Sequence, residues 1–355
     1  MKILIIGFGY AGHRYMHAFT HLSKKKSISL EIAYVSNQPC KVDIPYFENV
    51  PFALNNFKPD IAVVSVNDQN HMSILKELMD FKGFIICEKP LSTPEENWFP
   101  ICDNLRKRSG FALDLVERYS DATRRLKKTV SSNHWSLIRS SFHWGKDRLN
   151  DYRPTCGATS EIIHALDLIS WICPCNQKIE LKEAIGICSD FSISGEKVLD
   201  TILLTASLGK ATIAAYSSFV NIKRQRTVDF SFLDLKGQII HSQIIYDTPN
   251  WDNDYLCIWK RDNTGNVVII DEFNAIHQEP GLKTVYKLSQ LCEDVVRYVS
   301  GEPPHQDFAT LEDSINLQKL LDSINDKISS PLITQYIIGS ERTLIPKTAN
   351  LESLG

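Results

Sequence analysis

The sequence lacks an apolar run approaching the roughly 18 residues that predict a transmembrane helix. It also lacks a basic excess, because 39 Lys and Arg residues stand against 42 Asp and Glu residues, for a formal net charge of −3. Clustered positive charge is the usual signature of a nucleic-acid-binding surface. These absences lead us to expect that the chain binds neither a membrane nor a nucleic acid.

The nine cysteines predict neither a disulfide framework nor a metal site. Cys87 and Cys188 stand in apolar surroundings, as reduced thiols of a cytosolic protein do. Cys173 and Cys175 form a close pair, but no second pair of Cys or His stands nearby to complete a metal site. The apolar start of the chain is too short for a secretory signal. We therefore expect a cytoplasmic protein without a bound metal.

The amino terminus joins a short apolar run, Ile3–Ile6, to the glycine pattern G-x-G-x-x-G and then to apolar residues at helical spacing. A strand, a glycine loop and a helix in this order predict a dinucleotide-binding unit. The first glycine permits a tight turn, the second lets the backbone approach a pyrophosphate, and the third lets helix and strand pack closely. The helix amino terminus then offers N–H groups to the phosphates. The predicted cofactor-binding loop comprises Gly7, Phe8, Gly9, Tyr10, Ala11 and Gly12.

The type of dinucleotide is indicated by the end of the second expected strand, Leu30–Val35. Ser36 and Asn37 follow this strand, and the first carboxylate is Asp43. A carboxylate at this place holds the ribose 2′-OH of NAD and would repel the 2′-phosphate of NADP. The sequence therefore favours NADP over NAD, with Ser36 and Asn37 at the cofactor and Lys41 as the nearby cation.

Two further apolar runs, Ile61–Val66 and Phe84–Cys87, predict buried strands of a parallel sheet. Ligands bind just past the carboxyl ends of such strands. The candidate cofactor-binding residues here are Val66, Asn67, His71, Glu88 and Lys89. Asn67 and His71 are equally consistent with ordinary turn chemistry, and Lys89 is also consistent with a surface lysine made rigid by Pro90.

The glycine loop, the polar loop ending in His71 and the sequence Glu88-Lys89-Pro90-Leu91 together resemble the Gfo/Idh/MocA family, which includes glucose–fructose oxidoreductase and inositol dehydrogenase. In that family the lysine of this motif points at the substrate beside the nicotinamide. The resemblance therefore assigns a catalytic and substrate-binding role to Lys89. It also implies that the dinucleotide-binding domain covers residues 1–119.

A second part of the resemblance lies in residues 157–171, which are helical by pattern. The family has an Asp, a His four positions later and another Asp three positions after that. His164 matches the catalytic His, and Asp167 matches the later Asp, which implies that Asp167 binds substrate hydroxyls. Ser160 replaces the first Asp, and the nearest acid is Glu161, which shares a helix face with His164. We expect Glu161 to orient His164.

An expected strand over residues 138–144 leads into three cationic residues, Lys146, Arg148 and Arg153. In the family this connection approaches the substrate, so the three residues are candidates to bind a carboxylate or phosphate of the substrate. The alternative is a charged surface loop.

Strand-like runs separated by glycine turns fill residues 179–270 and predict an antiparallel sheet. The expected fold class is α/β, with an N-terminal doubly wound parallel Rossmann sheet. An α+β domain with a large, mostly antiparallel sheet follows over residues 120–330, and residues 331–355 form a tail. The resemblance implies a homodimer or homotetramer formed through the outer face of that second sheet.

The predicted function is transfer of a hydride between NAD(P) and a carbonyl or carbinol carbon of a small sugar, cyclitol or related metabolite. His164 serves as general acid and base, and Lys89 hydrogen-bonds the reacting oxygen. Two alternatives stay open. One is a non-catalytic dinucleotide-binding sensor or co-regulator, and the other is an NAD-dependent glycosidase or epimerase that uses transient oxidation.

Overall fold

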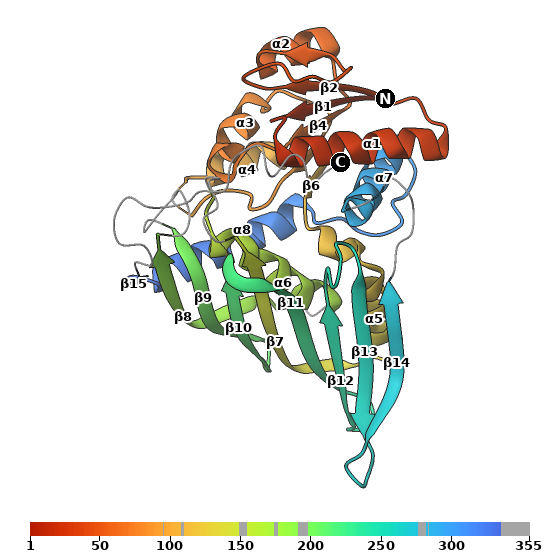
Figure 1. The fold of residues 1–355 in the computed structure, drawn as a ribbon, viewed down its shortest axis with the longest axis vertical. Helices are drawn as coiled ribbons and strands as arrows, with labels where there is room; N and C mark the ends of the chain where they lie inside the picture. The colour runs from red at the N-terminus through yellow and green to blue at the C-terminus, as the bar shows by residue number, and fades with distance from the viewer. Residues whose placement is uncertain are drawn as a thin grey trace. The chain divides into compact units, whose positions relative to one another are not determined.

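The structure, a computed structural model, describes residues 1–94, 96–107, 110–148, 155–173, 177–190, 198–275, 282 and 284–334. The chain divides into two units, shown in Figure 1. Unit 1 comprises Met1–Val116 and Glu279–Gln318, and unit 2 comprises Glu117–Gln278 and Lys319–Gly355.

Unit 1 is built on a six-stranded sheet in which every pairing is parallel, in the order β3-β2-β1-β4-β5-β6. The central strands are buried along nearly their whole length, because helices cover both faces of such a sheet. The doubly wound parallel sheet expected from the sequence is thus confirmed. The strands are β1 (Lys2–Ile6), β2 (Glu31–Val35), β3 (Tyr46–Phe47), β4 (Ile61–Val64), β5 (Phe84–Cys87) and β6 (Phe111–Leu113).

The helices of unit 1 come from both ends of the chain. The helix α7 packs against α1, and Figure 1 shows the two side by side. Lys26 Nζ lies 2.9 Å from Glu293 Oε1, and the Arg14 guanidinium donates to the Thr284 carbonyl at 2.6 Å. The helices are α1 (Tyr10–Lys26), α2 (Val50–Phe57), the 3-10 helix η1 (Asp68–Asn70), α3 (His71–Glu77), α4 (Phe99–Leu105) and α7 (Tyr286–Val299).

The carboxyl ends of four neighbouring strands lie in register. Ile6 pairs with Val64, Val64 with Cys87, and Cys87 with Leu113. The next residue of each chain segment therefore stands at the same edge of the sheet, where parallel sheets bind ligands. These four edge residues are Gly7, Ser65, Glu88 and Asp114.

Unit 2 contains a nine-stranded sheet in the order β14-β13-β12-β11-β7-β10-β9-β8-β15. Its pairings are antiparallel except for β7 with β10 and β8 with β15, which confirms the expected mostly antiparallel sheet. The strands are β7 (Ser136–Asp147), β8 (Ile179–Ser189), β9 (Leu199–Leu208), β10 (Ala211–Ser218), β11 (Val220–Leu233), β12 (Ile239–Ile245), β13 (Asp254–Arg261), β14 (Val267–Ala275) and β15 (Leu332–Thr334).

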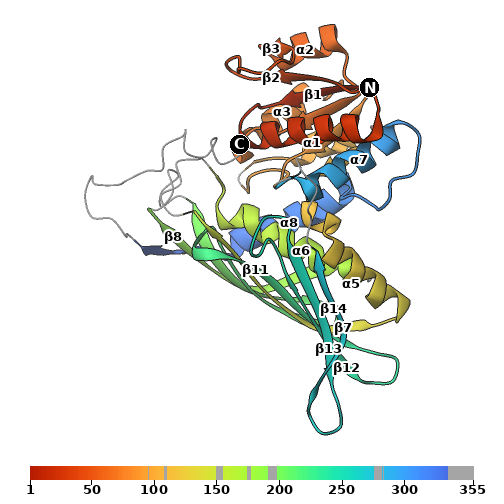
Figure 2. The same cartoon turned by 45° about the vertical axis from the view of Figure 1, so that its right-hand side comes forward.

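One face of this second sheet is covered by helices, as Figure 2 shows. The helix α6 contacts β7, β9 and β10, and α5 contacts β13 and β14. The 3-10 helix η2 (Val116–Tyr119) leads into α5 (Asp121–Ser132), α6 spans Ala158–Ile172, and α8 spans Leu311–Lys327. In the described part of the chain, no helix combines the length and the apolar character needed to cross a bilayer.

Candidate functional site

The three glycines of the loop after β1 serve different purposes. Gly7 has a φ of +93°, and a Cβ there would lie 2.7 Å from the backbone nitrogen of Val66. A Cβ on Gly12 would lie 2.3 Å from the Gly7 carbonyl oxygen, so α1 can pack against β1 only without a side chain. A Cβ on Gly9 would meet nothing within 4 Å. The space beside Gly9 is therefore open to a ligand, as close approach of a pyrophosphate requires.

The amino terminus of α1 has the character of a phosphate site. No side chain caps Gly9, and the first turn of α1 contains no acid, so neither competes with an anion for the backbone N–H groups. The Phe8 ring packs between the rings of Tyr34 and His13, with centroids 4.1 Å and 4.4 Å away. Burial lowers the pKa of His13. The loop residues predicted from the sequence can thus hold a dinucleotide phosphate.

The segment after β2 contains no acid between Ser36 and Val42. The Ser36 carbonyl accepts a hydrogen bond from the Tyr46 hydroxyl at 3.2 Å, which fixes the backbone there. Asn37 and Lys41 are exposed. The residues expected to meet the ribose 2′ position are therefore accessible and uncharged or cationic.

His71 lies beneath two of the loops that follow the strands rather than on their surface. It is fully buried, with Nδ1 2.7 Å from the Pro90 carbonyl and Nε2 3.2 Å from the Val66 carbonyl. The side-chain oxygen of the exposed Asn67 accepts from the Asn70 amide within the same loop. The contacts of both residues agree with the turn chemistry that the sequence left open, and His71 joins the loops after β4 and β5.

Glu88 and Asp114, neighbours on the edge of the sheet, form an acid pair. Burial, the Asp114 charge and a hydrogen bond between the two carboxyl groups raise the pKa of Glu88 well above its usual value, although Lys89 and Arg14 act in the opposite direction. The Tyr15 hydroxyl donates to Asp114 Oδ2 at 2.8 Å. A hydrogen bond between two carboxyl groups requires a proton on one of them, and the raised pKa of Glu88 favours the protonated form of its carboxyl group. Lys89, half-buried, follows directly after this pair.

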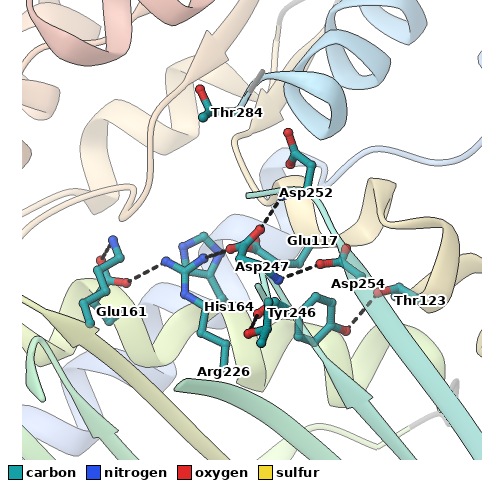
Figure 3. A network of polar contacts seen from close by, with 12 residues as sticks. Glu117, Thr123, Glu161, His164, Arg226, Tyr246, Asp247, Asp252, Asp254 and Thr284 are labelled. Atoms are coloured by element: carbon teal, nitrogen blue, oxygen red, sulfur yellow. Dashed lines mark hydrogen bonds and ion pairs between the residues drawn. The ribbon is translucent and has the colours of Figure 1, made fainter. Parts of the chain in front are cut away.

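In unit 2, His164 is held on two sides, and Figure 3 shows it together with Glu117, which holds one of them. Its Nδ1 lies 2.6 Å from Glu117 Oε2, and both side chains are buried. Its ring stacks on Trp144 with centroids 5.6 Å apart and an angle of 25° between the planes. Only 5% of His164 is exposed. An acid on one ring nitrogen and an aromatic wall fix the orientation of the imidazole, as a general acid and base requires.

The ion pairs found for Glu161 are with Lys146 and Arg226, whereas the sequence predicts a contact with His164. Its Oε1 lies 2.5 Å from Lys146 Nζ, and its Oε2 lies 3.8 Å from Arg226 Nη2. Helical side chains lean toward the helix amino terminus. The Glu161 side chain therefore leans away from His164, which lies three residues later, and reaches Lys146 on β7.

Arg226 on β11 is the centre of the cluster in Figure 3. Its Nη1 lies 2.5 Å from Asp247 Oδ2 and 3.6 Å from Glu117 Oε1. Burial acts to lower the pKa of Arg226, but the carboxylates of Asp247, Glu117 and Glu161 outweigh it and raise that pKa. The guanidinium also lies over the Trp144 ring, 5.1 Å from its centroid. Sequence reasoning missed both Glu117 and Arg226.

The remaining predicted substrate residues have different surroundings. Both carboxylate oxygens of Asp167 accept from Arg118, at 2.8 Å and 2.5 Å, within a fully buried pair. Lys146 is buried against Glu161. Arg148 is half-buried, and its backbone N–H donates to the Phe219 carbonyl at 2.9 Å. Arg153 lies outside the described residues.

A metal centre is not among the features found. Among the described residues, no group of three or more His, Cys, Asp or Glu side chains could hold a metal ion. The parallel sheet, its glycine loop and the open phosphate site define unit 1 as a dinucleotide-binding domain.

Comparison with known families identifies this domain further. Residues 1–112 match the oxidoreductase family with the NAD-binding Rossmann fold, GFO_IDH_MocA. This match over the first part of the chain confirms the resemblance found in the motifs and the expectation of NAD or NADP as cofactor. No curated protein sequence matches the chain.

Solved structures match nearly the whole chain at low identity. Levoglucosan dehydrogenase in complex with NADH and L-sorbose is 13% identical, with a TM-score of 0.71 over 92% of this chain and 96% of that one. A super-repressor mutant of Gal80p from Saccharomyces cerevisiae is 12% identical, with a TM-score of 0.70 over 92% and 95%. The 3-ketoreductase KijD10 from Actinomadura kijaniata, in complex with NADP and TDP-benzene, is 12% identical, with a TM-score of 0.68 over 95% and 99%. These likenesses show the fold.

Proposed function

We propose that the protein is an NAD(P)-dependent oxidoreductase acting on a carbonyl or carbinol carbon of a small sugar, cyclitol or related metabolite. The observation that carries this proposal is the buried His164 imidazole, with an acid at Nδ1 and Trp144 against its ring, in a chain whose other unit has an NAD-binding fold. A protein that only sensed the dinucleotide would have no need of an imidazole held in this way.

In this proposal the glycine loop, Lys89 and His164 have separate roles. The nicotinamide, when bound, supplies or accepts the hydride. The glycine loop and the amino terminus of α1 hold the pyrophosphate. Lys89 donates a hydrogen bond to the reacting oxygen and stabilises the negative charge that develops there. His164 takes the proton from that oxygen in oxidation and returns it in reduction.

The preference between the two dinucleotides is proposed to be for NADP. Support comes from the accessible Asn37 and Lys41 and from the lack of a carboxylate between Ser36 and Val42, since a carboxylate would repel a 2′-phosphate. Calorimetric titration with each dinucleotide tests this preference. Tighter binding of NAD than of NADP would contradict it.

The experiment for the activity is a panel of polyols, amino sugars and imines, offered with each oxidised and reduced dinucleotide and followed by nicotinamide absorbance. We expect turnover of at least one polyol or sugar, and its loss in His164→Asn. A panel with no turnover would favour the sensor or co-regulator, a function whose support is the fold shared with Gal80p. A dinucleotide that stays bound through purification and returns to its starting redox state would favour the glycosidase or epimerase.

We also propose that two copies of the chain associate through the outer face of the sheet in unit 2. The strand registers place an apolar stripe across that face, opposite the helices, and two of its members are strongly exposed: Ile185 at 57% and Leu203 at 41%. Exposed apolar stripes of this kind mark interaction surfaces. The stripe continues through Tyr216 and His143, whose rings lie 4.4 Å apart.

A further inference from the structure

We infer that Glu117 is the positioning residue for His164, in place of the acid that the family resemblance led us to expect on α6 itself. The inference rests on the proposed function, because it gives His164 a proton to exchange. The geometry that carries it is the ion-pair contact of 2.6 Å between Glu117 Oε2 and His164 Nδ1, in surroundings that leave each side chain no more than 6% exposed.

Glu117 is fixed from its second oxygen as well. Its Oε1 lies 3.6 Å from Arg226 Nη1, and the same nitrogen lies 2.5 Å from Asp247 Oδ2. Asp247 accepts in turn from the backbone N–H of Asp252 at 2.9 Å. The carboxylate of Glu117 is therefore held between an arginine that is itself anchored and the imidazole, and it has little freedom to turn away.

This arrangement selects one form of the neutral imidazole. The negative charge of Glu117, which also acts on Arg226, favours the tautomer that turns a proton rather than a lone pair of Nδ1 toward Oε2. The lone pair is then on Nε2, which is the form that can take a proton from a hydroxyl group. An acid in the same relation to a histidine of a Ser-His-Asp triad sets the tautomer and orientation without itself taking up the proton. Trp144 stacks on the ring and resists its rotation.

Glu117→Gln tests the inference at constant size. A glutamine amide can donate to Nδ1 and so favours the opposite tautomer. We expect kcat to fall by about 10²- to 10⁴-fold, the range of general acid–base catalysis, with KM and dinucleotide affinity within a few-fold of wild type. A fall of kcat that is matched by an equal loss of dinucleotide affinity would point to a structural role instead and would overturn the inference.

Glu161→Gln is the matched control. It removes another buried carboxylate beside Arg226, one whose ion pairs are with Arg226 and Lys146. We expect its loss in kcat to be at least tenfold smaller than that of Glu117→Gln. Equal losses in the two variants would mean that the charge of the cluster, and not the Glu117 contact, supports His164, and would overturn the inference.

Nuclear magnetic resonance can report the tautomer of His164 directly, without a measurement of turnover. In protein labelled with ¹⁵N-histidine, His164→Asn identifies the His164 signals. We expect the Nδ1-protonated tautomer in wild type and in Glu161→Gln, and a shift toward the Nε2-protonated tautomer in Glu117→Gln. An unchanged tautomer in Glu117→Gln would overturn the inference. A panel without turnover would instead count against the proposed function and leave this readout to decide the role of Glu117.

Moving the acid back onto α6 gives a rescue test. Ser160 is buried at the position where the family has its Asp. In the double variant Glu117→Gln with Ser160→Asp, we expect kcat to recover by at least tenfold over Glu117→Gln alone. Recovery together with the wild-type tautomer supports the positioning role, whereas a double variant that folds and binds dinucleotide but shows neither would contradict it.

Discussion

Hydrogen bonds of its two neighbours in the chain set the position of Lys89. The Glu88 backbone N–H donates to the Val64 carbonyl at 2.9 Å, and the Pro90 carbonyl lies 2.7 Å from His71 Nδ1. The residues on either side of Lys89 are therefore held by neighbouring parts of unit 1. A lysine on such a rigid turn needs to move little when negative charge develops on a nearby oxygen. A donor that is preorganised in this way lowers the activation free energy of the reaction.

Lys89→Ala tests this role. Removing one donor to a developing oxyanion costs about 10²- to 10³-fold in kcat, and we expect a loss of this size with dinucleotide affinity within a few-fold of wild type. Lys76→Ala, at an exposed position of α3, is the control. Turnover by Lys89→Ala at the wild-type rate would remove Lys89 from the mechanism.

The acid pair beneath Lys89 makes a prediction about stability and pH. The raised pKa of Glu88 means that the folded state keeps a proton that the unfolded chain releases near an ordinary pKa of about 4.3. This contribution to stability is fully present below that pH and is lost as pH rises toward the folded pKa. Glutamine cannot ionise, yet its amide can still donate to Asp114. Glu88→Gln should therefore be more stable than wild type at neutral pH.

Urea unfolding at several pH values above the ordinary pKa of glutamate measures the effect. The fall in unfolding free energy with pH should be shallower in Glu88→Gln by up to about 1.4 kcal/mol per pH unit, the slope for one proton. Glu77→Gln, on the exposed side of α3, should keep the wild-type slope. Parallel profiles for wild type and Glu88→Gln would mean that Glu88 is ionised in the folded protein.

At the scale of helices and strands, short-range patterns were sufficient for most of unit 1. The apolar run Phe84–Cys87 is a strand as predicted, and α1 begins at Tyr10, within the glycine pattern. The apolar run at residues 111–116 is a strand only as far as Leu113, and η2 begins at Val116. Leu113 there donates its N–H to the Ala309 carbonyl at 2.9 Å, a partner nearly 200 residues away that no local pattern reveals.

Alanine substitutions at two glycines of the loop should have different effects, one on dinucleotide affinity and the other on stability. A Cβ at Gly9 meets open space, so Gly9→Ala should change the unfolding free energy by less than about 1 kcal/mol. The methyl group would occupy the space that the phosphate needs, so dinucleotide affinity should fall by about tenfold or more.

Gly12→Ala should show the opposite pattern. Its Cβ would collide with the Gly7 carbonyl oxygen at 2.3 Å, and such overpacking costs about 1–3 kcal/mol. Urea unfolding and calorimetric dinucleotide titration separate the two effects. Equal losses of affinity and stability in both variants would show that the space at Gly9 does not serve a phosphate.

Over the whole chain, the parts that sequence reasoning could not place are those assembled from distant segments. The family motif identifies His164 from the sequence. Its acidic partner Glu117 comes from η2, and the residues that fix Glu117 come from elsewhere: Arg226 from β11 and Asp247 from the turn after β12. The sequence favours Glu161 because helix spacing relates residues only along one helix. The sequence shows an acid at Glu117, but its burial and its partner depend on tertiary packing.

The outer face of the second sheet gives the prediction that concerns the assembled molecule. Leu203 pairs with Ile185 on one side and Tyr216 on the other, so a charge at Leu203 would stand in the middle of the apolar stripe. If this face joins two copies by a twofold axis, the charge is introduced twice and faces buried apolar surface. Leu203→Glu should then shift the mass measured by light scattering to that of one chain, with the far-ultraviolet circular dichroism unchanged. Lys236→Glu, in the exposed turn between β11 and β12, should keep the wild-type mass. A Leu203→Glu protein with the wild-type oligomeric mass would place the interface elsewhere.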